Sequence, residues 1–175
     1  AGLVDIDVTG SGTGVAIASS NAGGTFAFTG GLDINSASGT GFEALSGTVS
    51  VAATAGVESI TSTAAQALNL ENVVLGAAGV TFDSISSTGS GSTGIHINGV
   101  SGGAFTVSGA ATVSGSTGNA IQMTGNSAAL AFNGATSITM SNAAAAVDFA
   151  GTSSGAVSFA NLDIALQSTN ATGFD

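Results

Sequence analysis

Apolar residues occur along this chain in closely spaced pairs that return every 26 or 27 residues. The pairs begin at Val15, Phe42, Leu68, Ile95, Ile121, Val147 and Phe174. The first six are followed two positions later by a second apolar residue, namely Ile17, Ala44, Leu70, Ile97, Met123 and Phe149. Spacing by two places both side chains on one face of a β-strand. A fixed period along the whole chain is typical of repeat folds, in which each unit buries its apolar face on its neighbours.

Two further short alternating segments precede each of the better-defined pairs. The clearest unit comprises residues 105–107, 111–113 and 121–123, and an earlier unit at an offset of 79 comprises residues 26–28, 32–34 and 42–44. Later segments are residues 130–132, 136–138, 147–149, 157–159 and 164–166. Gly, Ser, Thr and Asn fill the intervening turns, where they favour changes of chain direction. Between residues 73 and 97 the pattern allows more than one register.

Three short strands per period predict an all-β fold, a right-handed parallel β-helix (β-solenoid) of about seven three-strand rungs. Right-handed winding is favoured because parallel crossovers are right-handed in most proteins. Residues 1–175 are expected to form one β-solenoid domain. The absence of proline agrees with a chain made of hydrogen-bonded strands. The residues expected in the core are Phe26, Phe28, Phe42, Phe105, Val107, Ile121, Phe132 and Phe149.

The repeat unit of residues 104–125, AFTVSGAATVSGSTGNAIQMTG, resembles the right-handed parallel β-helix repeats of large bacterial surface and secreted proteins, adhesin-like proteins among them. The resemblance covers the whole chain. It implies an extracellular or cell-surface location. It does not define an activity, because unrelated functions share this fold.

The charge balance narrows the choice of partners. The chain has no Lys or Arg and ten Asp plus Glu, which gives a net charge of −10. Phosphate neutralisation needs basic side chains, so we expect no nucleic-acid partner. No uninterrupted apolar segment reaches 18 residues, so we expect no helical membrane insertion. Without cysteine the chain has no disulfide or thiolate metal site. Ala1 in place of Met indicates a processed chain or an excised fragment.

The outward residues of the closing strands form one predicted column. Its members are Ala16, Glu43, Asn69, His96, Gln122, Asp148 and Asp175. His96 is flanked by Asn69 and Gln122, and the nearest acids in the column stand two rungs away, at roughly 10 Å. A general base needs its partner at about 3 Å. We therefore expect no catalytic residue, no cofactor and no enzymatic activity.

Two other kinds of chemistry compete with this interpretation. Asp5 and Asp7 point outward from one strand and are weak candidates for binding Ca²⁺, which prefers several oxygen ligands, although a solubilising acidic edge explains them as well. Polysaccharide lyases and hydrolases also use β-helices. Lyases of this fold commonly use Arg or Lys as the base, and glycosidases need two carboxylates flanking a sugar. The chain offers no basic residue and no Trp or Tyr platform.

The open ends of such a rod suggest its role. Val4, Ile6 and Val8 at one end and Phe174 at the other are predicted to lie on unpaired strand edges, which invite pairing. We expect these ends to be covered by another copy, or by further rungs if the chain is a fragment. The expected function is an extracellular structural protein that associates head-to-tail into a filament, with side-by-side packing of rods as a further contact, or that forms a surface stalk.

An adhesin module that binds a glycan or a regular surface such as ice is the alternative. The predicted outward columns are small but mixed in chemistry: Ala27, Ser50, Thr106, Ala131 and Ser158 in the first, and Asp33, Ser59, Thr112, Ser137 and Ala165 in the second.

Overall fold

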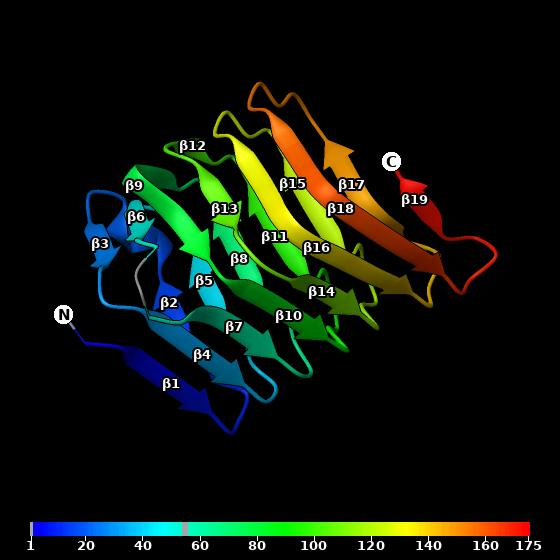
Figure 1. The fold of residues 1–175 in the computed structure, drawn as a ribbon, viewed down its shortest axis with the longest axis horizontal. Coiled ribbons are helices and arrows are strands. Elements are labelled where there is room, and N and C mark those ends of the chain that lie inside the picture. Colours follow the sequence, from blue (N-terminus) through cyan, green and yellow to red (C-terminus); the bar gives the residue numbers. More distant parts are fainter. Residues whose placement is uncertain (1, 54–55) are drawn as a thin grey trace.

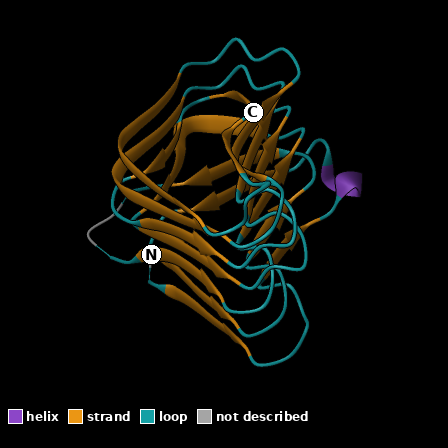
Figure 2. Ribbon diagram, turned by 90° about the vertical axis from the view of Figure 1, so that its right-hand side faces the viewer, coloured by secondary structure: helices purple, strands orange, loops and turns teal. Residues whose placement is uncertain are grey.

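In a computed structural model the chain winds into a parallel β-solenoid of about six turns (Figure 1). The structure describes residues 2–53 and 56–175. Each turn runs through three stacks of strands, and each pairing between described strands is parallel. Figure 2 shows the coil turned by 90°, with the short 3₁₀ segment η1 (Ser19–Asn21) projecting at one corner. Handedness stays a prediction from the general rule for parallel crossovers.

The first stack contains β3 (Thr25–Phe28), β6 (Thr48–Val51), β9 (Val74–Phe82), β13 (Phe105–Val107), and the first parts of β16 (Leu130–Met140) and β18 (Val157–Leu166), with β12 (Ser101–Gly102) beside β9. The second contains β1 (Val4–Val8), β4 (Leu32–Ser36), β7 (Glu58–Ser62), β10 (Ser84–Thr88), β14 (Ala111–Ser114), and the second parts of β16 and β18. The third contains β2 (Val15–Ile17), β5 (Phe42–Ala44), β8 (Leu68–Glu71), β11 (Ile95–Asn98), β15 (Ile121–Thr124), β17 (Ala145–Ala150) and β19 (Thr172–Phe174).

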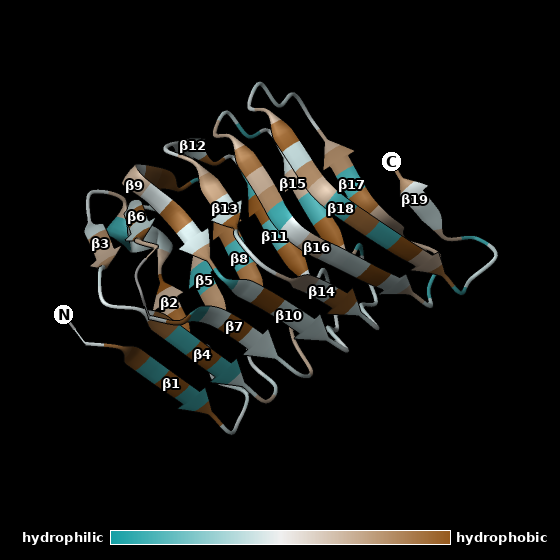
Figure 3. Cartoon of the chain, in the orientation of Figure 1, coloured by the Kyte–Doolittle hydropathy of each residue, from teal (hydrophilic) through white to brown (hydrophobic). Residues whose placement is uncertain are grey.

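The third stack confirms the apolar pattern residue by residue. Val15 pairs with Phe42, and the same column continues through Leu68, Ile95, Ile121 and Val147 to Phe174. Hydrophobic and hydrophilic bands alternate along these strands in Figure 3. At about 4.8 Å per strand, seven strands give this stack a length of about 29 Å.

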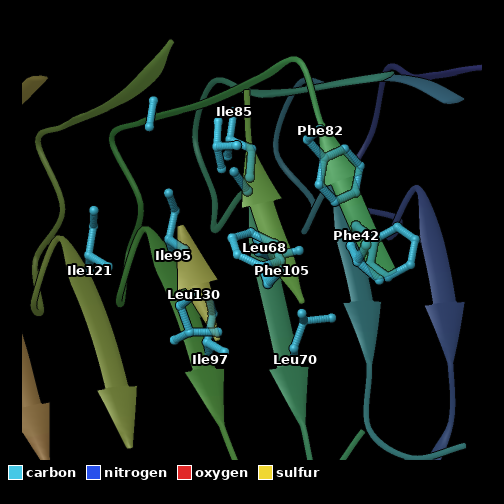
Figure 4. Close-up of a cluster of buried hydrophobic side chains, with 14 of the residues drawn as sticks. Phe42, Leu68, Leu70, Phe82, Ile85, Ile95, Ile97, Phe105, Ile121 and Leu130 are labelled. Atoms are coloured by element: carbon cyan, nitrogen blue, oxygen red, sulfur yellow. The ribbon is translucent and has the colours of Figure 1, made fainter. Parts of the chain in front are cut away.

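Ile, Leu and Val side chains make up most of the interior, and phenylalanine rings lie among them (Figure 4). Phe42 is fully buried and meets Phe28 and Phe82 edge-on, with both ring-centroid distances at 5.9 Å. Phe105 lies 6.0 Å from Phe132. Such tilted contacts suit the charge distribution of aromatic rings, which makes them favourable beyond the area that they bury.

Three of the residues expected in the core are not fully buried. Phe26 and Phe28 are only partly buried because β3 is the first strand of its stack. Phe149 is 40% exposed. It lies beyond the last pair between β17 and β19, Val147 with Phe174, so no residue of β19 is paired with it. Phe149 instead stacks on Phe174, with ring centroids 6.1 Å apart.

The predicted offset of 79 residues holds in the third stack and is wrong in the other two. Phe105 shares its column with Phe28, and Ala111 shares its column with Ile34, an offset of 77 in both cases. A slip of two residues keeps each side chain on the same face, so apolar alternation cannot detect it. The corner between the second and third stacks is two residues longer in the later unit, and this restores the offset of 79 in the third stack.

The same kind of slip affects β18, the last strand of the second stack. Ser137 faces Asp163, whereas the sequence prediction placed Ala165 in that column. The uncertain segment after residue 73 contains a bulge. Val49 and Val51 of β6 face Leu75 and Val80 of β9, so extra residues of β9 loop out between them.

One corner uses left-handed backbone in four successive turns. Asn72 has φ 54°, and it is the single non-glycine residue with positive φ in the described part of the chain. Gly99, Gly125 and Gly151 occupy the same place in the next three turns, each following a strand of the third stack, with φ of 63°, 60° and 69°. Glycine adopts this conformation without steric cost, and asparagine tolerates it better than most residues.

The second stack contains one buried hydroxyl that we expect to be destabilising. The Thr136 side chain points inward between Ala111 and Leu162, and its Oγ1 has no hydrogen-bond partner among the described residues. Thr136→Val keeps the shape and removes the unsatisfied polar atom. We expect the free energy of unfolding to rise by about 1 kcal/mol, measured by urea denaturation. Thr112→Val on the exposed side of β14 is the control and should change little; a destabilised Thr136→Val would contradict the expectation.

Candidate functional site

A ladder of polar side chains follows the outer face of the third stack. We call Glu43, Asn69, His96, Gln122 and Asp148 the polar ladder. The Asn69 Nδ2 donates to Glu43 Oε2 at 3.2 Å, and the Asn69 Oδ1 lies 2.9 Å from His96 Nδ1. At the other end the Gln122 Nε2 donates to Asp148 Oδ2 at 2.8 Å. The predicted column and the neighbours of His96 within it are therefore confirmed.

The hydrogen bonds assign the proton on the imidazole ring. Asn69 uses its amide nitrogen toward Glu43 and offers its carbonyl oxygen to His96. An amide oxygen only accepts, so His96 Nδ1 carries the proton and Nε2 is the basic nitrogen of the neutral ring.

Glu71 adds a contact that the sequence prediction missed. Its Oε1 lies 3.5 Å from His96 Nδ1, with side-chain exposures of 36% for Glu71 and 20% for His96. Glu71 stands two residues after Asn69 on β8, opposite Asn98 and therefore outside the column of His96. Its long side chain reaches back toward the histidine. The sequence contained one signal for this contact, namely an acid at the diagonal position on a neighbouring strand. The acids of the column itself, Glu43 and Asp148, stand two rungs from His96 as expected.

Burial and charge act on His96 in opposite directions. Removal of the ring from water lowers the pKa of His96 below 6.5, and the Glu71 carboxylate acts to raise it, with burial the larger influence. The ring is therefore neutral at pH 7 and cannot form a permanent ion pair with Glu71. In this state the polar ladder contains two runs of hydrogen bonds between adjacent turns, Glu43–Asn69–His96 and Gln122–Asp148.

We expect the midpoint of the His96 titration, followed by NMR of the single histidine, to lie below pH 6.5. Glu71→Gln removes the charge that raises this pKa and should lower the midpoint further. Because the unfolded ring takes up its proton first, the His96 contribution to stability is complete above pH 6.5 and declines as the pH falls below that value. His96→Gln should remove this part of the pH dependence. A midpoint above 6.5 would contradict the assignment.

The polar ladder does not have the geometry of a glycosidase site. Glu43 and Asp148 lie four strand spacings apart, about 19 Å, whereas the paired carboxylates of glycosidases lie within about 10 Å. Asp148 also accepts a hydrogen bond at 2.7 Å from Asn119 Nδ2, in addition to that from Gln122. Both acids at the ends of the ladder are engaged with amide groups, which fits a role in holding turns together.

The calcium candidates lie on the first strand of the second stack. Asp5 stands opposite Asp33 and Asp7 opposite Asn35, with all four side chains on the outer face. Asp7 also lines an open hollow of about 440 Å³, with Asn35 and Thr61 among its other lining residues. Across the described residues, no group of three or more His, Cys, Asp and Glu is arranged to hold a metal ion.

The corrected register brings hydroxyl side chains together on the middle strands of the second stack's outer face. Ser59 faces Ser84, and two longer outward columns run beside this pair. We call these residues the hydroxyl face: Ser59 and Ser84; Thr61, Ser86, Thr112 and Ser137; Thr88, Ser114 and Thr139. The sequence prediction placed Ser59 in one column with Thr112, which concealed the regularity.

Comparison with known protein families, curated proteins and solved structures gives no match. The architecture itself therefore defines the class of protein, a parallel β-solenoid. In the part of the chain that the structure describes, no helix has the length and apolar character needed to cross a membrane.

Proposed function

We propose that this protein is an extracellular structural rod whose turns continue from one molecule to the next. The observation that carries the proposal is the exposure of apolar side chains at both ends of the coil. Val4 is 41% exposed at one end, and Phe174 is 53% exposed at the other. Ile6 and Val8 of β1 are partly buried, because β4 covers only one side of that strand.

Unpaired strand edges favour association with another strand. Within the solenoid, backbone groups of each inner turn are bonded to the turns before and after it. By contrast, β1, β2 and β3 at one end and β18 and β19 at the other have a strand on one side only in their stacks. A further turn would satisfy these backbone groups and cover the apolar side chains. Contacts of this head-to-tail kind do not close into a ring unless the rotation allows it, so they generate filaments.

The extracellular setting is supported by composition and by the adhesin-like character of the repeats. A chain without Lys or Arg contains no site for trypsin-like proteases, and a chain without cysteine needs no particular redox environment. We propose the bacterial cell surface as its location and other copies of this chain as its principal partner. The same rod would serve in a free filament or in a surface stalk.

Acidic pH should promote association of the rods. The chain carries a net charge of −10 with no basic partner, and these charges repel neighbouring molecules at pH 7. Near pH 4, where carboxyl groups in general take up protons, we expect larger assemblies in light scattering and regular filaments in electron micrographs. Unchanged or reduced association at pH 4 would count against the proposal.

Two variants with equal added charge separate end contacts from side contacts. Phe174→Asp places a charge at the exposed end, and Thr112→Asp places the same charge on the flank. We expect Phe174→Asp to reduce the sedimentation coefficient of the assemblies and Thr112→Asp to leave it nearly unchanged. Monodisperse monomers at high concentration at both pH values would overturn the filament proposal.

The hydroxyl face favours a second function, binding to a regular surface such as ice. Its nine Ser and Thr side chains repeat at the strand spacing of about 4.8 Å and carry no charge. Partition of the protein into slowly growing ice is the test. Thr112→Glu on this face should abolish partition, whereas Thr106→Glu on the outer face of β13 in the first stack should retain it. Exclusion of the unmodified protein from ice would remove this candidate, and specific binding to a defined glycan would favour an adhesive module instead.

The structural proposal includes the absence of catalysis. The histidine in the polar ladder contacts Asn69 and Glu71, and neither arrangement provides an activated nucleophile. Cleavage of acidic polysaccharides that disappears in His96→Ala would overturn this part of the proposal.

A further inference from the structure

The residue columns specify how two copies of this chain would meet. We propose that β1 of a second copy docks on the second part of β18, and its β2 on β19, so that the second and third stacks continue in register across the joint. This inference rests on the proposed function, because it defines the contact through which the rods associate.

The second stack provides the first argument. One inward column begins at Ile6, continues through Ile34 and Ile60, and ends at Leu162. The parallel column two residues later begins at Val8 and ends at Ile164, and it is apolar at both ends. The end residues of both columns are covered on one side only. Docking in register would place Ile6 on Leu162 and Val8 on Ile164, the same type of contact that connects turns within the molecule.

The third stack gives the same register independently. Val15 begins the column that Phe174 ends. Docking β2 on β19 therefore places the half-buried Val15 over the exposed Phe174 ring. On the outer face, Ala16 would stand opposite Asp175. Because alanine is uncharged, this pair brings no charge repulsion.

One contact opposes the joint at neutral pH. The outward column that starts at Asp7 ends at Asp163, so the in-register joint places these two carboxylates on directly opposed strands. Like charges in that arrangement are destabilising. The joint is accordingly expected to be strengthened when either aspartate is replaced by a neutral residue.

The first stack would remain interrupted at the joint. Among the described residues the first strand, β1, belongs to the second stack and the last strand, β19, belongs to the third. A continuous coil would require a strand of the first stack between them. The in-register joint therefore separates β18 of one copy from β3 of the next by two strand spacings, about 10 Å, and this gap distinguishes it from other packings.

Engineered cysteines test the register, since the chain has none of its own. Asp7→Cys and Asp163→Cys variants are mixed in equal amounts and oxidised. Opposed residues on adjacent strands meet the distance requirement of a disulfide, so we expect a covalent dimer from the mixture and none from either variant alone. Asp5→Cys mixed with Asp163→Cys is the matched control. Its residues are two positions out of register, about 7–8 Å apart, and should yield at least tenfold less dimer.

A third mixture examines the gap. Ala27→Cys on β3 and Ser158→Cys on β18 should remain reduced, because two strand spacings exceed the reach of a disulfide. Efficient crosslinking of this pair, a dimer of Asp7→Cys with itself, or preferred crosslinking of the Asp5 control would each overturn the proposed joint.

Sedimentation of the same mixtures under reducing conditions separates the two proposals. Association without the Asp7–Asp163 crosslink would overturn the in-register joint and leave the proposed structural rod standing. Absence of association at every concentration, at pH 7 and at pH 4, would overturn both. Association together with the expected crosslink pattern supports both.

Discussion

Replacing Phe42 with alanine is expected to lower the free energy of unfolding by about 3–5 kcal/mol. The ring is fully buried in the third stack and lies 5.9 Å from the rings of both Phe28 and Phe82. Its removal leaves a cavity bounded by strands of two stacks, and the parallel hydrogen-bond ladders prevent the walls from closing. Urea denaturation followed by circular dichroism measures the loss.

Phe174→Ala is the matched control for this prediction. It removes the same ring from a position that is 53% exposed at the end of the same column. The loss of stability should be a small fraction of that for Phe42→Ala, because most of the ring remains in water in the folded state. Equal losses for the two variants would show that the interior is not packed as described.

Gly134→Ala is expected to destabilise the protein by about 1–3 kcal/mol through overpacking. A Cβ atom at this position would lie 2.0 Å from the carbonyl oxygen of Gly109 and 2.7 Å from its Cα, and neither backbone atom can move independently of the neighbouring turn. The site lies between the first and second parts of β16, where the pairing with β18 shifts register. Thermal or urea unfolding measures the effect.

The control is Gly91→Ala in an open turn, where an added Cβ meets no atom within 4 Å. This substitution also restricts the unfolded chain, so it should leave the stability unchanged or raise it by less than about 1 kcal/mol. If both alanine variants unfold alike, close backbone approach is not the reason for glycine at position 134.

The register of the third stack could be predicted because its apolar pairs recur with little variation in spacing. Each inward pair from Val15 to Phe149 is a distinct signal, and no equally good register competes with it. The parallel pairing followed from the length of the period, since a strand can return to its neighbour in the same direction only after a connection of this length.

The registers of the first two stacks were harder to predict because a shift of two residues leaves the apolar pattern intact. Phe28 and Phe26 are equally suitable partners for Phe105 on the basis of hydropathy alone. The correct choice depends on how many residues each corner holds, and corners of Gly, Ser and Thr carry little information about their length. The bulge in β9 added a further irregularity to the same stack.

The prediction of the candidate sites depended on these registers. His96 and its column were predicted because they belong to the third stack. Glu71 was missed because a long side chain can reach a diagonal neighbour, which a search along one column does not consider. The hydroxyl face became visible only once Thr61, Ser86 and Thr112 were placed together.

The left-handed corner at Asn72, Gly99, Gly125 and Gly151 has a consequence for how the fold can change length. Each turn closes with its own local bend, and its ladders reach only the turns immediately before and after. A duplication or deletion of one whole period would therefore keep every remaining residue in its place and create only one new contact between adjacent turns. Insertion or loss of part of a period inside a strand would instead turn apolar side chains outward. Selection on such a chain can vary the length of the rod in steps of one turn while its cross-section is conserved.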